Sequence, residues 1–342
     1  MLDQAVKKIV SGESLSVEEA REASLELFSG EVPDALIGAL LVALKMKRES
    51  VDEIEGFALG MREAKVSVNP RVERLVDTCG TGGDRKGTFN ISTVAAIIAA
   101  ACGVKVAKHG NRSVSSGCGS ADVLEALGVN IEMQPEEVCE CIERIGIGFM
   151  FAPVYHPAMK RVMGARKSLG IPTIFNIIGP LTNPAGARYQ VLGVNRKDLV
   201  PTIGRVLASL GCKRGFVLNG LDGMDEFTLA SETLVCEISE GETKEYVVSP
   251  EDLGLERCDG MELSGGDAKQ NARIVKEILN GKPGPRFDVS IANASFALVS
   301  SGMAQSLKEG VERARLAVES GKAEMVLNQL VDFSKGDIRD VS

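Results

Sequence analysis

The sequence predicts an α/β protein with a small helical domain, followed by a larger α/β domain with a mostly parallel central sheet. Three observations support this prediction. The chain has 342 residues, which is more than one ordinary core needs and suits two domains. Helix-start signals recur over about the first 65 residues. From Arg74 on, short apolar strands, glycine-rich loops and helices alternate, which is typical of parallel βαβ units.

Three helices are expected in the N-terminal part. Ser16-Val-Glu-Glu19 is a capping box, in which the side chains of Ser and Glu satisfy free backbone N–H groups, and its helix should end near Gly30. An apolar helix is expected over residues 35–47. A second capping box, Ser50-Val-Asp-Glu53, predicts a helix over residues 51–64.

The remainder of the chain supplies the strands of the sheet and the helices that cover it. Strands are expected over residues 75–78, 104–107, 129–132, 190–194 and 215–218, and an antiparallel hairpin over 233–248. Helices are expected over 92–102, 121–127, 157–169, 199–210, 289–299 and 307–320, with another starting at Pro135. Loops rich in glycine or polar residues separate them at 80–87, 109–119 and 177–184.

Composition and charge exclude several classes of protein. A net charge of −8 repels nucleic acid and acidic membranes, so we expect neither as a partner. The eight cysteines contain no C-x-x-C pair, which favours reduced thiols of a cytoplasmic protein over a zinc or disulfide framework. We find no signal-peptide pattern and no apolar run of membrane-spanning length.

Two segments around the first expected strand have the composition of a phosphate site. Gly80-Thr-Gly-Gly-Asp84 directly follows the strand, and such glycines let backbone N–H groups converge on an anion. Asn90-Ile-Ser-Thr93 opens the next helix, whose N-terminus attracts phosphate. Alone, the first segment would be an ordinary flexible turn and the second an ordinary helix cap. Together they favour phosphate binding.

The segment from Lys108 to Ser116 packs two cations, several hydroxyls and an amide into nine residues. Lys108 offers a point charge for pyrophosphate, whereas Arg112 either forks onto a phosphate or supports the loop. His109 is either a general base or a packed loop histidine. An ordinary solvated loop rarely concentrates such groups, so the segment indicates a second anion-binding element.

Acidic and basic side chains further along the chain complete the candidate site. Asp225-Glu226 is an adjacent carboxylate pair just beyond a strand, and a divalent cation such as Mg²⁺ explains why like charges stand together. The alternative is a solvated acidic turn. Arg166, on an expected helix, is a surface charge unless it lies beside the other elements.

These motifs resemble those of the anthranilate phosphoribosyltransferase family of tryptophan biosynthesis. GTGGD, NIST, KHGNRSVSS, GSADVLEALG, HPAM, IFNIIGPLTNPA and DGMDE occur in that family's order, over about residues 12–330. KHGNRS discriminates best, because the related pyrimidine nucleoside phosphorylases carry a different loop. Departures fall on Asn219, Tyr155 and Gly117-Cys118, and none is at an expected metal or substrate position.

The resemblance implies a nucleoside phosphorylase-like fold and an assembly. The helical domain would be residues 1–70, joined by a returning segment near 155–184, and the α/β domain would be residues 71–342. The active site would lie in the cleft between the two domains. The family implies a homodimer formed through the helical domain, with each active site complete within one chain.

The resemblance also implies a reaction and its residues. Anthranilate would accept the phosphoribosyl group of 5-phospho-α-D-ribose 1-diphosphate (PRPP), releasing pyrophosphate, with two Mg²⁺ ions in each site. Catalytic residues would be Lys108, Asn111 and Arg166, and metal ligands Ser92, Asp225 and Glu226. Substrate contacts would come from Gly80, Gly82, Gly83, Asp84, Thr88, Asn90, Ile91, Ser92, Thr93, Lys108, His109, Gly110, Asn111, Arg112, Ser113, Val114, Ser115, Ser116, Ser120, His156, Arg166 and Pro180.

Two alternatives of other kinds stay open at this point. One is a nucleoside phosphorylase of the same fold, against which KHGNRS and Arg166 argue. The other is a nucleic-acid-binding relative that has lost transferase activity, which should show broken glycine or metal motifs and a basic groove. The motifs of this chain are intact and the chain is acidic.

Overall fold

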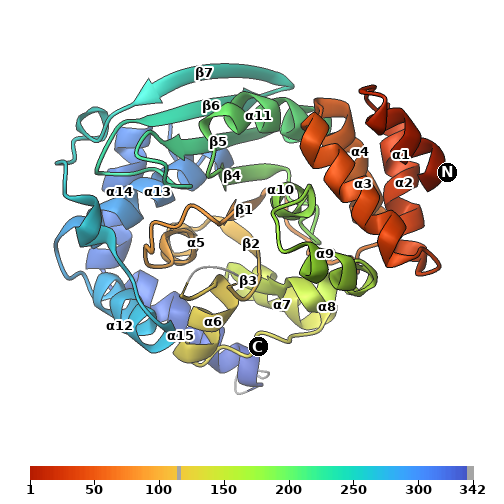
Figure 1. Ribbon diagram of the computed structural model, residues 1–342. Helices are drawn as coiled ribbons and strands as arrows, with labels where there is room; N and C mark the ends of the chain where they lie inside the picture. The colour runs from red at the N-terminus through yellow and green to blue at the C-terminus, as the bar shows by residue number, and fades with distance from the viewer. Residues whose placement is uncertain (114–116, 337–342) are drawn as a thin grey trace.

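The computed structural model describes residues 1–113 and 117–336, so the predicted contacts of Val114, Ser115 and Ser116 lie outside the described residues. The N-terminal part consists of four helices, which Figure 1 shows in red and orange at one end of the molecule. Both capping boxes are confirmed, since the side chains of Ser16 and Ser50 accept from the backbone N–H groups of Glu19 and Glu53. The helices are α1 (Leu2–Val10), α2 (Val17–Ser29), α3 (Asp34–Lys47) and α4 (Val51–Glu63).

One seven-stranded sheet forms the centre of the remaining chain, in the order β3-β2-β1-β4-β5-β6-β7. The first five of these strands in that order are parallel, and β6 and β7 form an antiparallel hairpin at the edge. The strands are β1 (Leu75–Gly80), β2 (Lys105–Gly110), β3 (Ile147–Phe151), β4 (Tyr189–Gly193), β5 (Arg214–Gly220), β6 (Thr233–Ser239) and β7 (Glu242–Val248). The predicted fold class, with its mostly parallel sheet, is therefore confirmed.

Helices cover the sheet, and the C-terminal ones, blue in Figure 1, pack with the first helix of the α/β part. These helices are α5 (Ile91–Ala101), α6 (Ser120–Leu127), α7 (Pro135–Arg144), α11 (Val200–Ser209), α12 (Ala268–Leu279), α13 (Pro285–Ser301), α14 (Leu307–Glu319) and α15 (Lys322–Lys335). In the described chain, no helix combines the length and the apolar character that crossing a membrane requires.

The segment between β3 and β4 leaves the sheet and packs against the N-terminal helices. It contains α8 (Ala152–Tyr155), the 3-10 turns η1 (Pro157–Arg161) and η2 (Gly179–Leu181), α9 (Met163–Leu169) and α10 (Phe175–Ile178). α9 contacts α3 and η1 contacts α2. The buried apolar side chains accordingly form two clusters, one between the sheet and the C-terminal helices and one that joins the N-terminal helices, this segment and α11.

Strand order places a crevice at the carboxyl end of β1. From β1 the chain builds β2 and β3 on one side and β4 and β5 on the other, so the direction of winding reverses between β1 and β4. In parallel sheets this switch point is where ligands bind. The last residues of the two strands, Gly80 and Gly193, are register partners there.

Three expectations about local structure are wrong. Residues 129–132 form no strand but irregular backbone that ends in a turn, because Val129 and Ile131 bury their side chains in the main hydrophobic cluster without pairing with a strand. The expected helix over 157–169 is interrupted at Val162, between η1 and α9. β2 continues to Gly110, so the expected polar loop from residue 109 begins inside the sheet. Sequence analysis also missed β3 and α12.

Candidate active site

The glycine loop after β1 folds over the switch point. Thr81 N donates to the carbonyl of Gly193 over 2.9 Å, which ties the loop to β4. Gly82 and Gly83 have φ values of +64° and +80°, which side chains rarely adopt. Gly82 N donates to Asp225 Oδ2 over 2.7 Å. The carboxylate of Asp225 therefore accepts from one of the N–H groups that the sequence predicts to bind an anion.

Close packing brings Asp225 onto the ends of both central strands. A Cβ atom at Gly80 would lie 2.7 Å from Asp225 Oδ2, and a Cβ at Gly193 would overlap the main-chain carbonyl of Asp225. A side chain at Gly80 would displace the carboxylate of Asp225, and one at Gly193 would displace its main chain. Because Gly80 and Gly193 end β1 and β4, the acidic pair lies directly at the crevice.

Burial and mutual repulsion disfavour the charged forms of the carboxylates at the switch point. Burial, and then the charge of Asp84, raises the pKa of Asp225. Burial, and then the charge of Asp225, raises the pKa of Glu226 above its ordinary value, against the attraction of Lys108. Asp84 Oδ2 is buried without a hydrogen-bond partner among the described residues. Such a cluster has the hard oxygen ligands that a divalent cation prefers.

The described residues by themselves do not complete a metal site. No group of three or more His, Cys, Asp or Glu side chains in residues 1–113 and 117–336 has an arrangement that could hold a metal ion. Mg²⁺ usually keeps several water ligands and binds through one or two carboxylates together with substrate phosphates. The pair of Asp225 and Glu226 fits that mode, whereas a closed cage of protein ligands is excluded for this part of the chain.

Lys108 lies beneath the phosphate elements rather than in the open. Only 2% of the residue is exposed, because it stands inside β2. Its Nζ donates to the carbonyl of Thr78 over 2.6 Å and to Ser92 Oγ over 3.4 Å. Burial lowers the pKa of Lys108, and the nearby carboxylates of Asp77 and Glu226 oppose that shift. The ammonium group of Lys108 thus contacts Ser92 and at the same time attracts the carboxylate of Glu226.

The start of α5 presents the second predicted phosphate element. Asn90 is the N-cap residue, yet its side chain accepts no bond from its own helix. Ile91 and Thr93 are buried, and Thr93 Oγ1 has no hydrogen-bond partner in the described part of the chain. Thr88, just before the helix, forms an isolated bridge with Ser264.

Ion pairs hold Arg112, just after β2, against α6. Arg112 contacts Asp122 at 3.0 Å and Glu125 at 2.8 Å, and its guanidinium lies 5.6 Å from the centre of the Phe151 ring. As placed, Arg112 supports the loop, which is one of its two predicted roles. Asp122 Oδ2 also accepts from the backbone N–H groups of Ser113 and Gly119.

Asn111 and Ser120 stand at the two ends of that loop. Asn111 is exposed, its Oδ1 accepts from the backbone N–H of Arg112, and its carbonyl accepts from Ser120 Oγ over 3.4 Å. Gly110 lies so close to Ser120 Oγ that a Cβ atom would collide with it. The end of β2 and the start of α6 are therefore held close together, and the Asn111 amide lies at the surface.

The only two histidines of the chain, His109 and His156, pack ring to ring with centroids 5.0 Å apart. Both are buried, and neither Nε2 atom has a hydrogen-bond partner among the described residues. Burial, followed by the charges of His156 and Lys108, lowers the pKa of His109 well below its ordinary value. Burial and the charge of Lys65 lower the pKa of His156 to about 4. Both imidazoles are therefore neutral at pH 7.

Replacing His156 by Gln should remove part of the loss of folding stability that a fall in pH causes in the wild type. Between pH 6.5 and 4 the unfolded chain protonates this histidine while the folded chain does not, so folding loses up to roughly 3 kcal/mol as pH falls through that window. Above pH 7 the residue is neutral in both states and contributes no slope.

Urea unfolding of both proteins at several pH values tests this expectation. The wild-type free energy of unfolding minus that of His156→Gln should be constant above pH 7 and fall toward pH 4. Asp77, whose pKa burial raises to about 6, has the opposite effect on acidification, but it is present in both proteins and cancels in the difference. A difference that does not vary with pH contradicts the buried, neutral state of His156.

Arg166 carries a positive charge without an acidic partner in the described chain. It stands on α9 with its guanidinium 5.4 Å from the centre of the Phe175 ring, and its nearest polar contact is the sulfur of Met163 at 3.9 Å. Burial lowers the pKa of this guanidinium. Pro180, also in the segment between β3 and β4, is buried and accepts from Gln190 Nε2 through its carbonyl.

Sequence reasoning missed the side-chain amides that hold these elements in place. Asn195 Nδ2 donates to the carbonyl of Gly82 over 2.7 Å. Asn293 on α13 both donates to and accepts from the backbone of Phe227, directly after the acidic pair. Asn183 Nδ2 donates to the carbonyl of Ala107 in β2. The one available signal was an amide within a strongly apolar stretch, as for Asn293 in α13.

Comparisons with known proteins agree with this fold and site. Residues 3–65 match the model of the glycosyl transferase family, helical bundle domain, and residues 72–324 match that of the glycosyl transferase family, a/b domain. The anthranilate phosphoribosyltransferase of Persephonella marina is 50% identical over 98% of this chain and 100% of its own length. The one from Desulforamulus reducens is also 50% identical, over 98% and 97%.

Solved structures give the same result. The crystal structure of anthranilate phosphoribosyltransferase from Thermus thermophilus superposes with a TM-score of 0.92 at 45% identity, covering 97% of this chain and 99% of that one. The enzyme from Saccharomyces cerevisiae, in complex with PRPP and Mg, superposes with a TM-score of 0.89 at 29% identity, with 98% of each chain covered. The chain therefore belongs to the anthranilate phosphoribosyltransferase family.

Proposed function

We propose that the chain transfers the phosphoribosyl group of PRPP to the amino group of anthranilate, giving N-(5-phosphoribosyl)anthranilate and pyrophosphate in tryptophan biosynthesis. The observation that carries the proposal is the meeting of the glycine loop and the acidic pair at the switch point, where Gly82 N contacts Asp225 Oδ2 at 2.7 Å. The full-length relatives at 50% identity support the same reaction.

The chain's own residues would act mainly by position and charge. The glycine loop, the start of α5 and the loop from Lys108 to Ser116 would hold the phosphate and pyrophosphate groups. Arg166 and Asn111 would hold anthranilate, with Arg166 on its carboxylate. The amine nitrogen bonds to C1 of the ribose, the bond from C1 to the pyrophosphate oxygen breaks, and one amine proton passes to solvent. Fixed positions of this kind contribute roughly 7–11 kcal/mol in favourable cases.

Mg²⁺ fits the donor set at the crevice, and Ser92, Asp225 and Glu226 would be its protein ligands. The raised pKa values of the two carboxylates and the unpartnered Asp84 Oδ2 support a cation there. When bound, Mg²⁺ supplies positive charge that offsets the charge developing on the departing pyrophosphate. We propose two ions in each site. The yeast relative was solved in complex with PRPP and Mg.

Anthranilate fluorescence tests the proposed reaction directly. Anthranilate mixed with PRPP and the protein should lose its fluorescence when Mg²⁺ is present, and a chelator should stop the loss. Incubation with thymidine and phosphate should release no thymine, and a gel shift in low salt should detect no complex with nucleic acid. Thymine release would favour the phosphorylase alternative, and a gel shift without anthranilate turnover would favour the nucleic-acid-binding alternative.

The predicted domain division stays a proposal with two supports. The boundary near residue 70 falls close to the gap between the two family-model matches, at residues 65 and 72. The contact of α9 with α3 supports the return of residues 155–184 to the helical domain. The α/β domain would then take the remainder of 71–342.

We propose further that two copies of the chain form a homodimer through the N-terminal helices. A groove of about 940 Å³ runs along α1, α3 and α9, and its lining includes Val10, Val42, Met46 and Leu169. Val10 is 72% exposed and Met46 is 80% exposed, and such apolar exposure on a groove is typical of an interface. A second copy on a two-fold axis would cover both grooves and leave each active site complete within one chain.

Light scattering at micromolar concentration should therefore report twice the mass of one chain. Met46→Glu places a charge in the groove and should shift the mass toward the monomer. Leu316→Glu, which changes an equally apolar residue on α14 with 64% exposure, is the matched control and should stay dimeric. A wild-type monomer with full activity would refute the assembly.

A further inference from the structure

A segment distant in the sequence packs against the backbone just before α5, next to the predicted phosphate site. Residues 262–266, which we call the bracket segment, lie against the loop that leads into α5. Phe89 N donates to the carbonyl of Leu263 over 3.2 Å, and Gly265 N donates to the carbonyl of Gly87 over 2.8 Å. The bracket segment thus fixes the backbone that places Thr88 and Asn90.

The contact is too close for any side chain on the bracket segment at its centre. A Cβ atom at Gly265 would lie 2.7 Å from Phe89 Cα and 2.6 Å from Asn271 Oδ1. The bracket segment is itself held by Arg286, which donates to the carbonyls of Ser264 over 2.7 Å and Glu262 over 3.1 Å. Backbone, guanidinium and amide groups therefore lock it in one position.

Asn271 joins the bracket segment to the start of α5. It stands on α12 and is 1% exposed. Its Oδ1 accepts from Gly266 N over 2.8 Å, and its Nδ2 donates to Asn90 Oδ1 over 3.0 Å. The amide of Asn90 in turn donates to the carbonyl of Cys118 over 3.1 Å. The buried amide of Asn271 and the half-buried amide of Asn90 thus connect α12, the start of α5 and Cys118.

This connection explains why Asn90 does not cap its own helix. An N-cap Asn ordinarily uses its side-chain oxygen to accept from an N–H of the first helical turn. Here Asn90 Oδ1 is turned to Asn271 and accepts no bond from α5. In the first turn of α5, Ile91 N and Thr93 N donate to the carbonyls of Phe89 and Asn90, so the N–H of Ser92 is the group that a capping side chain would otherwise occupy. The same turn carries the hydroxyl of Thr93, which has no hydrogen-bond partner among the described residues.

We propose that Asn271 is a positioning residue for PRPP, which keeps the N-terminus of α5 uncapped by holding the amide of Asn90 away from it. The inference rests on the proposed function, since it concerns binding of a phosphate group at that site. Without Asn271, Asn90 Oδ1 becomes free to accept from its own helix and competes with the phosphate oxygens.

Steady-state kinetics of Asn271→Ala test the proposal. The KM for PRPP should rise about tenfold, which corresponds to one lost phosphate hydrogen bond of about 1.4 kcal/mol, and the KM for anthranilate should not change. Calorimetric titration with PRPP alone should show the same loss of affinity. Asn271→Asp keeps the acceptor for Gly266 N but removes the donor to Asn90, so it should match Asn271→Ala in PRPP affinity while unfolding closer to the wild type.

A double-mutant cycle separates positioning from general stability. If Asn271 acts through Asn90, Asn271→Ala should have no further effect on the KM for PRPP in an Asn90→Ala background. The control is Asn280→Ala, which removes an exposed amide bond to the carbonyl of Lys276 on the same helix and should leave both KM values unchanged.

Additive effects in the cycle, or equal rises in both KM values, overturn the inference, because they assign Asn271 a purely structural role. An unchanged PRPP affinity in Asn271→Asp also overturns it. Failure of the proposed function looks different, since the wild-type chain would then give no product from anthranilate and PRPP.

Discussion

Asp225→Asn combined with Glu226→Gln should lower kcat/KM for PRPP by about 10²–10³-fold, the usual cost of removing an electrostatic catalytic element. Asp225 and Glu226 are the two neighbouring carboxylates at the ends of β1 and β4, and their pKa values are raised first by burial and then by the negative charge of neighbouring carboxylates. Amides at both positions keep the size of the side chains but remove the charge that would attract Mg²⁺.

The same variant should fold at least as well as the wild type, and this separates a functional role from a structural one. Holding like charges together in a partly buried site costs free energy, which neutral side chains do not. The thermal midpoint without Mg²⁺ should therefore stay the same or rise. The midpoint shift that Mg²⁺ with pyrophosphate produces in the wild type should be lost.

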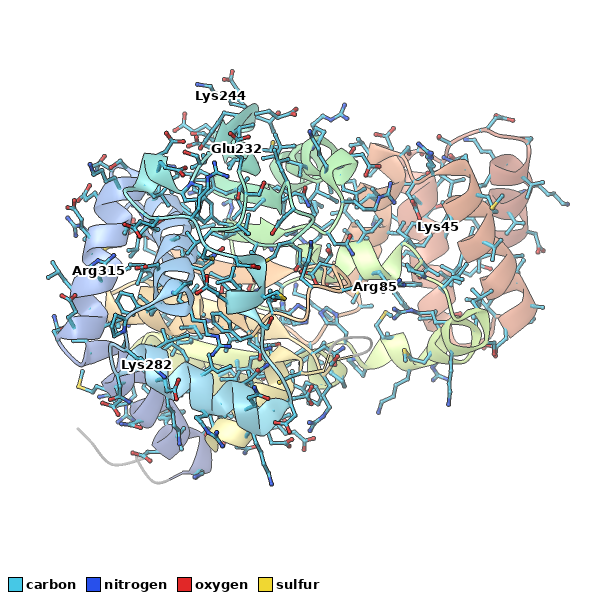
Figure 2. All side chains as sticks on the ribbon, turned by 60° about the vertical axis from the view of Figure 1, so that its left-hand side comes forward. Lys45, Arg85, Glu232, Lys244, Lys282 and Arg315 are labelled. Carbon is cyan, nitrogen blue, oxygen red and sulfur yellow. The ribbon has the colours of Figure 1, made fainter. Side chains whose placement is uncertain are left out.

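Glu232→Gln is the matched control, because Glu232 is an exposed carboxylate six residues further along (Figure 2). It should keep wild-type turnover and the wild-type response to Mg²⁺. If turnover of the double variant equals that of the wild type across a Mg²⁺ titration, the acidic pair is a solvated turn and the metal assignment is wrong.

Local chemistry explains which parts of the fold could be predicted from the sequence. The capping boxes at Ser16 and Ser50 start α2 and α4 because their hydrogen bonds close within four residues. The parallel sheet could be predicted for the same reason, because each strand and each helix shows its own periodicity of apolar residues. These signals do not depend on the rest of the chain.

The misassigned segments depend on partners distant in sequence. Val129 and Ile131 have the composition of a strand, but they pair with no strand and bury their side chains in the main hydrophobic cluster. Lys108 and His109 look like loop residues, yet their positions are inside β2 because β3, which the sequence analysis missed, pairs with them. Tertiary pairing overrides local preference in both cases.

The residues of the site also fall into those with local sequence signals and those that depend on distant partners. The glycine loop, the carboxylate pair and the segment from Lys108 could be predicted as functional, because each is a short motif whose residues are neighbours in the sequence. The amides of Asn195, Asn271 and Asn293 could not, since each bonds to a residue more than 60 positions away in the sequence. Figure 2 shows the glycine-loop residue Arg85 near the middle of the molecule, while Lys244 and Lys282 lie toward its periphery. Arg85 also has a φ of +59°, which its sequence context does not indicate.

Arg166→Ala is expected to raise the KM for anthranilate by about tenfold to a hundredfold and to leave the KM for PRPP near its wild-type value. A hydrogen bond to a charged group contributes about 1.5–3 kcal/mol, and each 1.4 kcal/mol is a factor of about ten. The guanidinium is partly buried, has no acidic partner in the described chain and lies over Phe175, so it is ready to pair with a carboxylate.

Two further variants on α9 decide whether charge or geometry matters. Arg166→Lys keeps the charge but not the planar fork, so its KM for anthranilate should fall between those of the wild type and Arg166→Ala. Lys167→Ala removes an exposed cation from the next position and should change neither KM. Because Arg166 has no ion pair to lose, the thermal midpoint of Arg166→Ala should stay close to that of the wild type. If the two KM values of Arg166→Ala rise equally, its guanidinium serves to pack α9 against Phe175, and the carboxylate of anthranilate is bound elsewhere.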